Sequence, residues 1–109
     1  MSYFGKNAVQ SWVEFNGSTD SVRASHNISS ISDTGVSEYD INFSTNFADA
    51  DYVVFGSTVG NNAGGYHSYI CSNGSTKSAS AAPVRFRHAE QHNNAGEMPY
   101  IGIAFVGNQ

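Results

Sequence analysis

The sequence predicts an all-β domain, an antiparallel β-sandwich of jelly-roll-like type, and three observations lead to that prediction. Leucine, a leading helix former, is absent from all 109 residues, while valine, isoleucine, phenylalanine and tyrosine together supply 28. Serine, asparagine and glycine, which favour turns, supply 38 more. Short apolar segments alternate with glycine- and asparagine-containing turns along the chain. The length suits one domain, which we place at residues 9–107 after a lead segment at 1–8.

Eight segments show either the alternation or the continuous apolar run that is expected of strands. They occupy residues 9–15, 21–27, 29–32, 39–43, 52–57, 66–72, 83–88 and 100–106.

In the first segment Val13 and Phe15 lie on one face of the predicted strand and Trp12 on the other. Asn16-Gly17 follows at once and predicts a hairpin turn, because both residues tolerate positive φ. The second and third segments are weaker strands, and the turn Asp33-Thr34-Gly35 ends them.

The fourth segment is a clean strand in which Tyr39, Ile41 and Phe43 line one face. The fifth is apolar on both faces through Phe55.

In the second half, the loose stretch 61–65 precedes the alternating sixth segment, and Asn73-Gly74 supplies a second hairpin-type turn. In the seventh segment Val84 and Phe86 lie opposite Arg85. The eighth segment is almost continuously apolar.

The fifth and eighth segments pose a covering problem, since only one face of a strand points inward in a two-sheet sandwich. Their second apolar face needs cover from a loop or from another copy of the chain. We therefore expect a closed, cyclic homo-oligomer. The alternative is a monomer whose serine-rich segments fold over these faces. Trp12 accordingly covers an interface, completes the core or stacks on a ligand.

Charge argues against several function classes. Charged residues make up 13% of the chain, about half the roughly 25% of an ordinary domain, and the net charge is −4. The five basic residues form no run, so we expect no nucleic-acid binding. No apolar stretch has the length of a membrane helix and no secretory signal is visible. Cys71 is the single cysteine and has no internal disulfide partner.

Catalytic and metal signals are weak, and we expect neither an enzyme nor a cofactor. His88 and His92 would lie about 13 Å apart in an extended chain, too far to share a zinc ion. No nucleophile elbow is present, and Asp49 and Asp51 are better explained as the end of a loop before a strand. Cys71 fits a small buried hydrophobe.

Surface recognition remains, because aromatic and amide side chains on the loops of a rigid β scaffold are common binding material. Two polar loop regions carry such side chains, and we take them as candidate binding residues: Asn62, Tyr66, His67, Gln91, His92, Asn93 and Asn94. Arg85 and Arg87 share a strand face, where they bind an anionic group or pair with nearby carboxylates.

Several motifs, taken in order, resemble a C-terminal domain of tail fibres and related virion proteins of tailed bacteriophages. The resemblance runs from about Ser11 to Gly107; it is fairly specific in its first half and generic in its second. The motifs are Trp12-Val-Glu-Phe-Asn-Gly17, Arg23-Ala-Ser-His-Asn-Ile-Ser-Ser-Ile-Ser-Asp-Thr-Gly35, Tyr39-Asp-Ile-Asn-Phe43, Asp49-Ala-Asp-Tyr-Val-Val54 and the closing Tyr100-Ile-Gly-Ile-Ala-Phe-Val-Gly107.

The resemblance implies a trimeric β-rich knob in the virion that contacts other virion proteins and a host-surface receptor, either polysaccharide or protein. It implies no cofactor and no catalytic residue, and it assigns no receptor-binding residue. Fibre proteins carry a long shaft that these residues lack, so we expect a small tip or decoration protein, or a piece of a longer fibre. A stand-alone carbohydrate-binding module is the alternative from another class. A small hydrolase that acts on surface polysaccharide is the least favoured.

Overall fold

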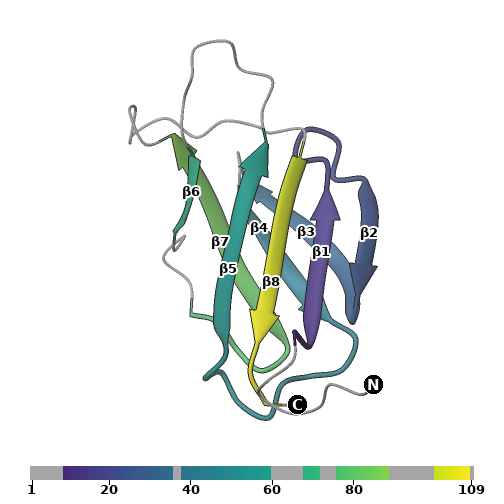
Figure 1. The fold of residues 1–109 in the computed structure, drawn as a ribbon, viewed down its shortest axis with the longest axis vertical. Helices are drawn as coiled ribbons and strands as arrows, with labels where there is room; N and C mark the ends of the chain where they lie inside the picture. Colours follow the sequence, from purple (N-terminus) through teal and green to yellow (C-terminus); the bar gives the residue numbers. More distant parts are fainter. Residues whose placement is uncertain (1–8, 36–37, 60–67, 72–75, 89–99, 109) are drawn as a thin grey trace.

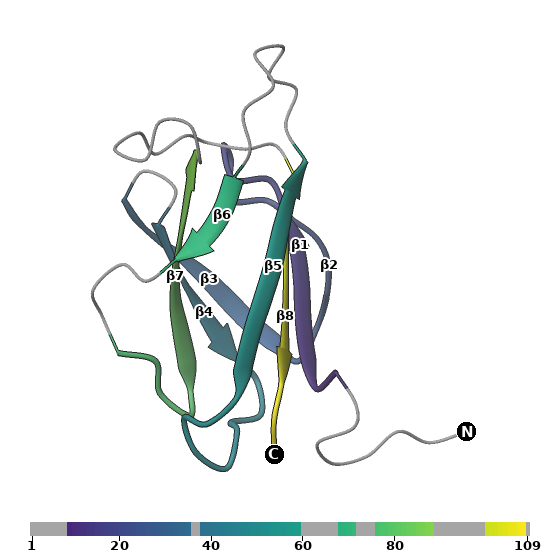
Figure 2. The same cartoon turned by 60° about the vertical axis from the view of Figure 1, so that its left-hand side comes forward.

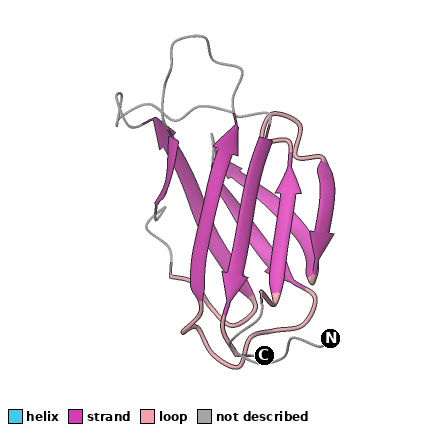
Figure 3. Ribbon diagram, in the orientation of Figure 1, coloured by secondary structure: helices cyan, strands magenta, loops and turns pink. Residues whose placement is uncertain are grey.

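A computed structural model describes residues 9–35, 38–59, 68–71, 76–88 and 100–108 of the chain. These residues form eight strands and no helix (Figure 3). The strands are β1 (Ser11–Phe15), β2 (Val22–His26), β3 (Ile28–Gly35), β4 (Glu38–Phe43), β5 (Val53–Val59), β6 (Ser68–Cys71), β7 (Ala81–His88) and β8 (Tyr100–Val106).

The strands form two antiparallel sheets packed as a sandwich, in the orders β2-β1-β8-β5 and β3-β4-β7-β6. Figure 1 shows the first sheet in front of the second, and Figure 2 shows both layers from the side. The all-β sandwich expected from the composition is confirmed. Each predicted strand has an observed counterpart, and β8 begins and ends at the predicted residues.

Strand alternation separates core from surface in both sheets. In β1, Ser11, Val13 and Phe15 are buried, while Trp12 and Glu14 point outward. β4 alternates in the same way, with Tyr39 and Ile41 buried. The faces predicted for these two strands are therefore confirmed.

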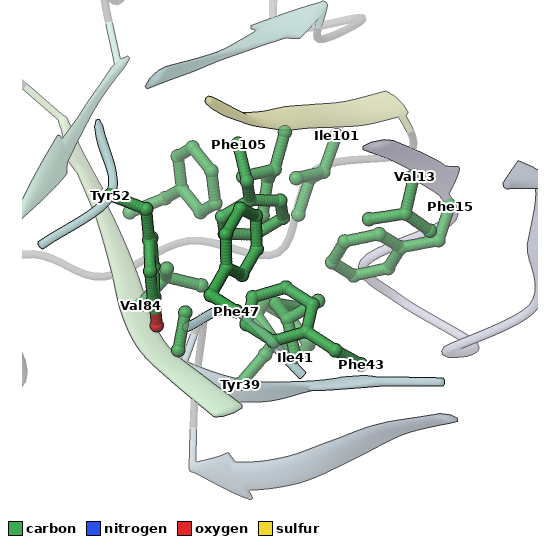
Figure 4. Packing of buried hydrophobic residues seen from close by; sticks show 13 residues of the cluster. Val13, Phe15, Tyr39, Ile41, Phe43, Phe47, Tyr52, Val84, Ile101 and Phe105 are labelled. Atoms are coloured by element: carbon green, nitrogen blue, oxygen red, sulfur yellow. The ribbon is translucent and has the colours of Figure 1, made fainter. Parts of the chain in front are cut away.

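Aromatic rings from the two sheets meet in the core (Figure 4). Phe15 of β1 and Tyr39 of β4 pack edge to face with ring centroids 4.9 Å apart. Phe43 makes the same kind of contact with Phe105 of β8, also at 4.9 Å. Edge-to-face geometry sets the positive rim of one ring against the negative face of the other, which adds to the stabilisation from burial. These pairs hold the two sheets together across the sandwich.

One residue, Asn27, carries the chain from the first sheet to the second. It separates β2 from β3 and has a φ of 59°, a left-handed conformation that asparagine tolerates better than most residues. Its side-chain amide donates to Ser11 Oγ at 2.7 Å and to the Thr45 carbonyl at 3.0 Å. Its side-chain oxygen accepts from the Thr45 backbone N–H at 2.6 Å. The corner is thereby bonded both to the start of β1 and to the segment after β4.

Tyr52 lies just before β5, at the end of the core where that strand begins. Its ring stacks on Phe47 with centroids 4.5 Å apart. Its hydroxyl donates towards the carbonyls of Ser78 at 2.7 Å and Ala81 at 3.1 Å, and its own carbonyl accepts from Lys77 Nζ. Burial raises the pKa of the Tyr52 hydroxyl from 10.0 to about 12, because the charged phenolate would lose its hydration.

The Asn27 corner predicts a specific order of stabilities. Asn27→Ala removes three side-chain hydrogen bonds and places a residue that disfavours positive φ at the corner, which we expect to cost about 3 kcal/mol of unfolding free energy. Asn27→Gly keeps the backbone freedom and should lose about 2 kcal/mol. The measurement is urea unfolding followed by circular dichroism. Asn42→Ala removes exposed bonds to Ser30 and Ser32 and is the matched control, with a loss below about 1 kcal/mol. An Asn27→Ala loss no larger than this control would contradict the assigned role.

Tyr52 predicts a loss of stability in alkali. Its raised pKa stabilises the fold fully below pH 10, where the unfolded chain keeps the phenol neutral. That contribution disappears as the pH rises from about 10 to about 12, and we expect it to amount to about 2 kcal/mol. Unfolding free energies between pH 8 and 12 test this. Tyr52→Phe should be less stable at pH 8 but decline less steeply; parallel pH profiles for the two proteins would contradict the prediction.

Candidate functional site

The predicted binding residues lie outside the part of the chain that the structure describes, so they stay predictions. They are Asn62, Tyr66, His67, Gln91, His92, Asn93 and Asn94.

Other residues that the sequence singled out have structural roles. The Asp51 backbone N–H donates to Asp49 Oδ1 at 2.8 Å, so this pair forms a local turn before β5, as expected. Arg85 pairs with Glu38, its Nε lying 2.6 Å from Oε1 of the carboxylate. Of the two roles left open for Arg85, the structure supports pairing with a nearby carboxylate. Within the described residues, no three His, Cys, Asp or Glu side chains gather where they could hold a metal ion.

Among the side chains that the structure describes, the large exposed apolar ones gather on one of the two sheets. Among the described residues, every large hydrophobic side chain with substantial exposure belongs to the β2-β1-β8-β5 sheet or lies two residues before β1: Val9, Trp12, Val22, Val53, Phe55 and Tyr100. The outward residues of β4 and β7 in the other sheet include Glu38, Asp40, Asn42 and Arg85. Within the described side chains, the outer face of the β2-β1-β8-β5 sheet is thus the more apolar of the two.

The covering problem predicted for β5 and β8 is real. Phe55 is 47% exposed and Val53 62% exposed, so no described segment folds over the outer face of β5. Trp12 is 39% exposed on the same outer face. The option that Trp12 completes the core is therefore wrong, while an interface or a ligand remains for it.

A groove of about 570 Å³ runs along this outer face, which is turned toward the viewer in Figure 1. Strand register explains its shape. In one cross-strand row Ala104 of β8 lies between Trp12 of β1 and Phe55 of β5. In the neighbouring row Gly102 lies between Glu14 and Ser57. Small residues on the central strand thus form a floor, and larger residues on the flanking strands form walls.

Two glycines shape the floor. A Cβ added at Gly102 would meet nothing within 4 Å, so the space above this residue is open. A Cβ at Gly56 would lie 2.7 Å from the Gly102 carbonyl oxygen, so glycine is needed there for β5 and β8 to approach. The groove therefore depends on Gly102 for its depth and on Gly56 for the pairing of its strands.

Tyr100 lines one end of the groove, and a β-bulge brings Arg23 to it. Glu14 pairs with Ala24 and Phe15 with Val22, so Arg23 is the extra residue of β2. A bulge of this kind re-aims one side chain. The Arg23 guanidinium carbon lies 4.2 Å from the centroid of the Tyr100 ring, a cation–π contact that fixes this end of the groove.

The groove is lined by aromatic, small and polar residues. Glu14 is the one carboxylate among the described lining residues. The volume falls within the roughly 300–1,000 Å³ of small-molecule sites. Three aromatic side chains, one carboxylate and the hydroxyls of Ser57 and Tyr100 are groups that can hold and orient a ligand.

Sequence reasoning found Trp12 but not the groove around it. The signal that could have revealed it is Gly102-Ile103-Ala104, in which both outward residues of an otherwise bulky apolar strand are small. The groove forms only because the strand register places Trp12 and Phe55 on either side of Ala104. Register between distant strands is not visible in the sequence.

The described residues contain no helix of the length and apolarity needed to cross a membrane. Comparison of the chain with protein-family models, curated proteins and solved structures gives no match in any of the three.

Proposed function

We propose that this chain is a non-enzymatic virion protein of a tailed bacteriophage, a tail-fibre tip or receptor-binding domain that attaches the particle to its host surface. The motif resemblance suggests that the protein is part of a phage virion. The single observation that carries the binding role is the open, aromatic-walled groove of about 570 Å³ on the exposed sheet face.

The shared motifs are compatible with this proposal because several of them serve the scaffold. Asn27 bonds the corner between the sheets. The Tyr39 hydroxyl, within the core, donates to the carbonyl of Gly17 in the first turn at 2.8 Å. A fixed scaffold with an outward binding face is what a recognition domain requires.

A stand-alone carbohydrate-binding module is the second candidate, and the same groove favours it. The two candidates differ in where the protein resides: a virion protein is part of the particle, whereas a separate module binds glycans without one.

We also propose that copies of the chain associate, with a trimeric knob as the arrangement. Three of the exposed valines, Val9, Val22 and Val53, are not among the groove-lining residues and offer apolar contact area to a neighbouring copy. Closed symmetry would also multiply weak surface contacts into avidity.

The virion role predicts a position and a competition. Antibodies raised against the chain should label the distal ends of tail fibres in electron micrographs of the parent phage. The purified protein should reduce adsorption of that phage to its host in a saturable manner, because both compete for one receptor. Heat-denatured protein is the control for this competition and should leave phage adsorption unchanged. Labelling of a capsid face with no effect on adsorption would contradict the proposal and favour a decoration protein.

The proposed association predicts a molar mass. Light scattering at micromolar concentration should give about three times the 11.7 kDa of one chain. Val53→Asp places a charge at the most exposed of the valines and should lower that mass if Val53 lies between copies. A single monomer peak for the unchanged protein would contradict self-association.

A further inference from the structure

We propose that the outer-face groove binds a neutral or amino-sugar pyranose ring, held between Trp12 and Phe55 with its hydroxyls on Glu14 and Ser57. This inference rests on the proposed function and names the ligand class of its receptor.

The area of the outer sheet face indicates whether a second copy of the chain or a smaller ligand occupies it. β1 and β2 have five residues each and β5 and β8 seven each. At about 3.3 Å per residue and about 4.8 Å per strand, the face covers roughly 380 Å². A standard protein interface takes about 800 Å² from each partner, so this face alone supplies less than half of that. A copy resting on it would need most of its contact elsewhere. The groove volume, by contrast, lies well inside the range of small-ligand sites.

The walls fit a flat ring. Trp12 and Phe55 are in register across Ala104, so their Cα atoms are two strand spacings, or about 10 Å, apart. A ring in van der Waals contact with both walls needs about 7–8 Å between them, twice the carbon–carbon contact distance. The alanine between the walls leaves that space open. A pyranose suits the walls because the axial C–H bonds on its faces carry partial positive charge, which the negative face of an aromatic ring attracts.

The polar groups lie where ring substituents would reach. Glu14 and Ser57 flank Gly102 in the next cross-strand row, two residues or about 7 Å along the strand from the aromatic row. A carboxylate accepts hydrogen bonds from two neighbouring hydroxyls, and a serine hydroxyl both donates and accepts. These groups can therefore orient a polyhydroxylated ring.

Charge narrows the class of sugar. Glu14 is the one acidic or basic side chain among the described lining residues. Beside the groove, Arg23 lies over Tyr100, and His26 pairs with Trp12 across the β1–β2 ladder. An acidic sugar would bring a second negative charge beside Glu14 without a cation between them. Neutral sugars avoid this repulsion, and the ammonium of an amino sugar gains an attraction to Glu14 and to the aromatic faces.

The chain contains its own probe, because Trp12 is its single tryptophan. A ring stacked on Trp12 should change its fluorescence directly. We would titrate the full chain with oligomers of glucose, galactose, N-acetylglucosamine and glucosamine, and with oligogalacturonate as the acidic probe. At least one neutral or amino-sugar oligomer should give a saturable emission change, and oligogalacturonate should give none at equal concentration.

Three variants assign the effect to the groove. Phe55→Ala removes one wall, and Gly102→Val fills the open floor without meeting a neighbour at its Cβ; each should weaken binding more than about tenfold. Asn42→Ala truncates a residue of β4 in the other sheet, outside the groove lining, and should bind as the unchanged protein does. Circular dichroism and melting temperatures verify that all three variants fold.

Several results would overturn the assignment: no saturable change with any sugar oligomer, equal affinities for Gly102→Val, Phe55→Ala and Asn42→Ala, or preference for oligogalacturonate. A saturable response to a polyproline peptide with none to sugars would identify a peptide groove instead. A lower molar mass for Phe55→Ala alone would identify a contact between copies.

Failure of this inference is distinguishable from failure of the proposed function. If the purified Gly102→Val and Phe55→Ala variants still compete with the phage for adsorption, the attachment role stands and the groove is not the receptor site. If the groove binds sugars but the chain neither labels fibres nor competes with adsorption, the groove assignment stands and the virion role fails.

Discussion

The sandwich depends on a single-residue corner. β2 belongs to one sheet and β3 to the other, and Asn27 alone connects them, so the backbone must turn sharply where the two layers meet. A longer loop would leave the relative position of the sheets to core packing alone. The side chain of Asn27 instead bonds to Ser11 at the start of β1 and to Thr45 after β4. Ser11 is fully buried, so this polar contact is shielded from competing water.

The arrangement of side chains on the outer face depends on how the two sheets are positioned. Once β1 is held at the corner, its alternation directs Val13 and Phe15 into the core and Trp12 and Glu14 away from it. β8 lies between β1 and β5, and its small outward residues then separate the larger ones on either side. The groove is thus a product of register, since no single strand contains its two walls.

Local features of the strands could be predicted well from the sequence, whereas the pairing of distant strands could not. The inward faces of β1, β4 and β7 could be predicted because a period of two is a local pattern, and Tyr39, Ile41, Val84 and Phe86 are buried as expected. Gly35 was assigned to a turn, yet β3 extends to it, because pairing with Glu38 of β4 continues the ladder past Asp33. Arg23 at the bulge could not be foreseen, since a bulge exists only relative to a partner strand.

The division between inward and outward positions has a consequence for how such a chain can change over time. Apart from Val13 and Ile103, the described residues that line the groove do not belong to the core cluster. Substitutions at Trp12, Phe55 or Ser57 can therefore accumulate without a matching cost in folding, while Phe15, Tyr39 and Phe105 stay constrained by the rings around them. A scaffold divided in this way can acquire a new ligand preference through a few outward replacements and keep the same architecture throughout.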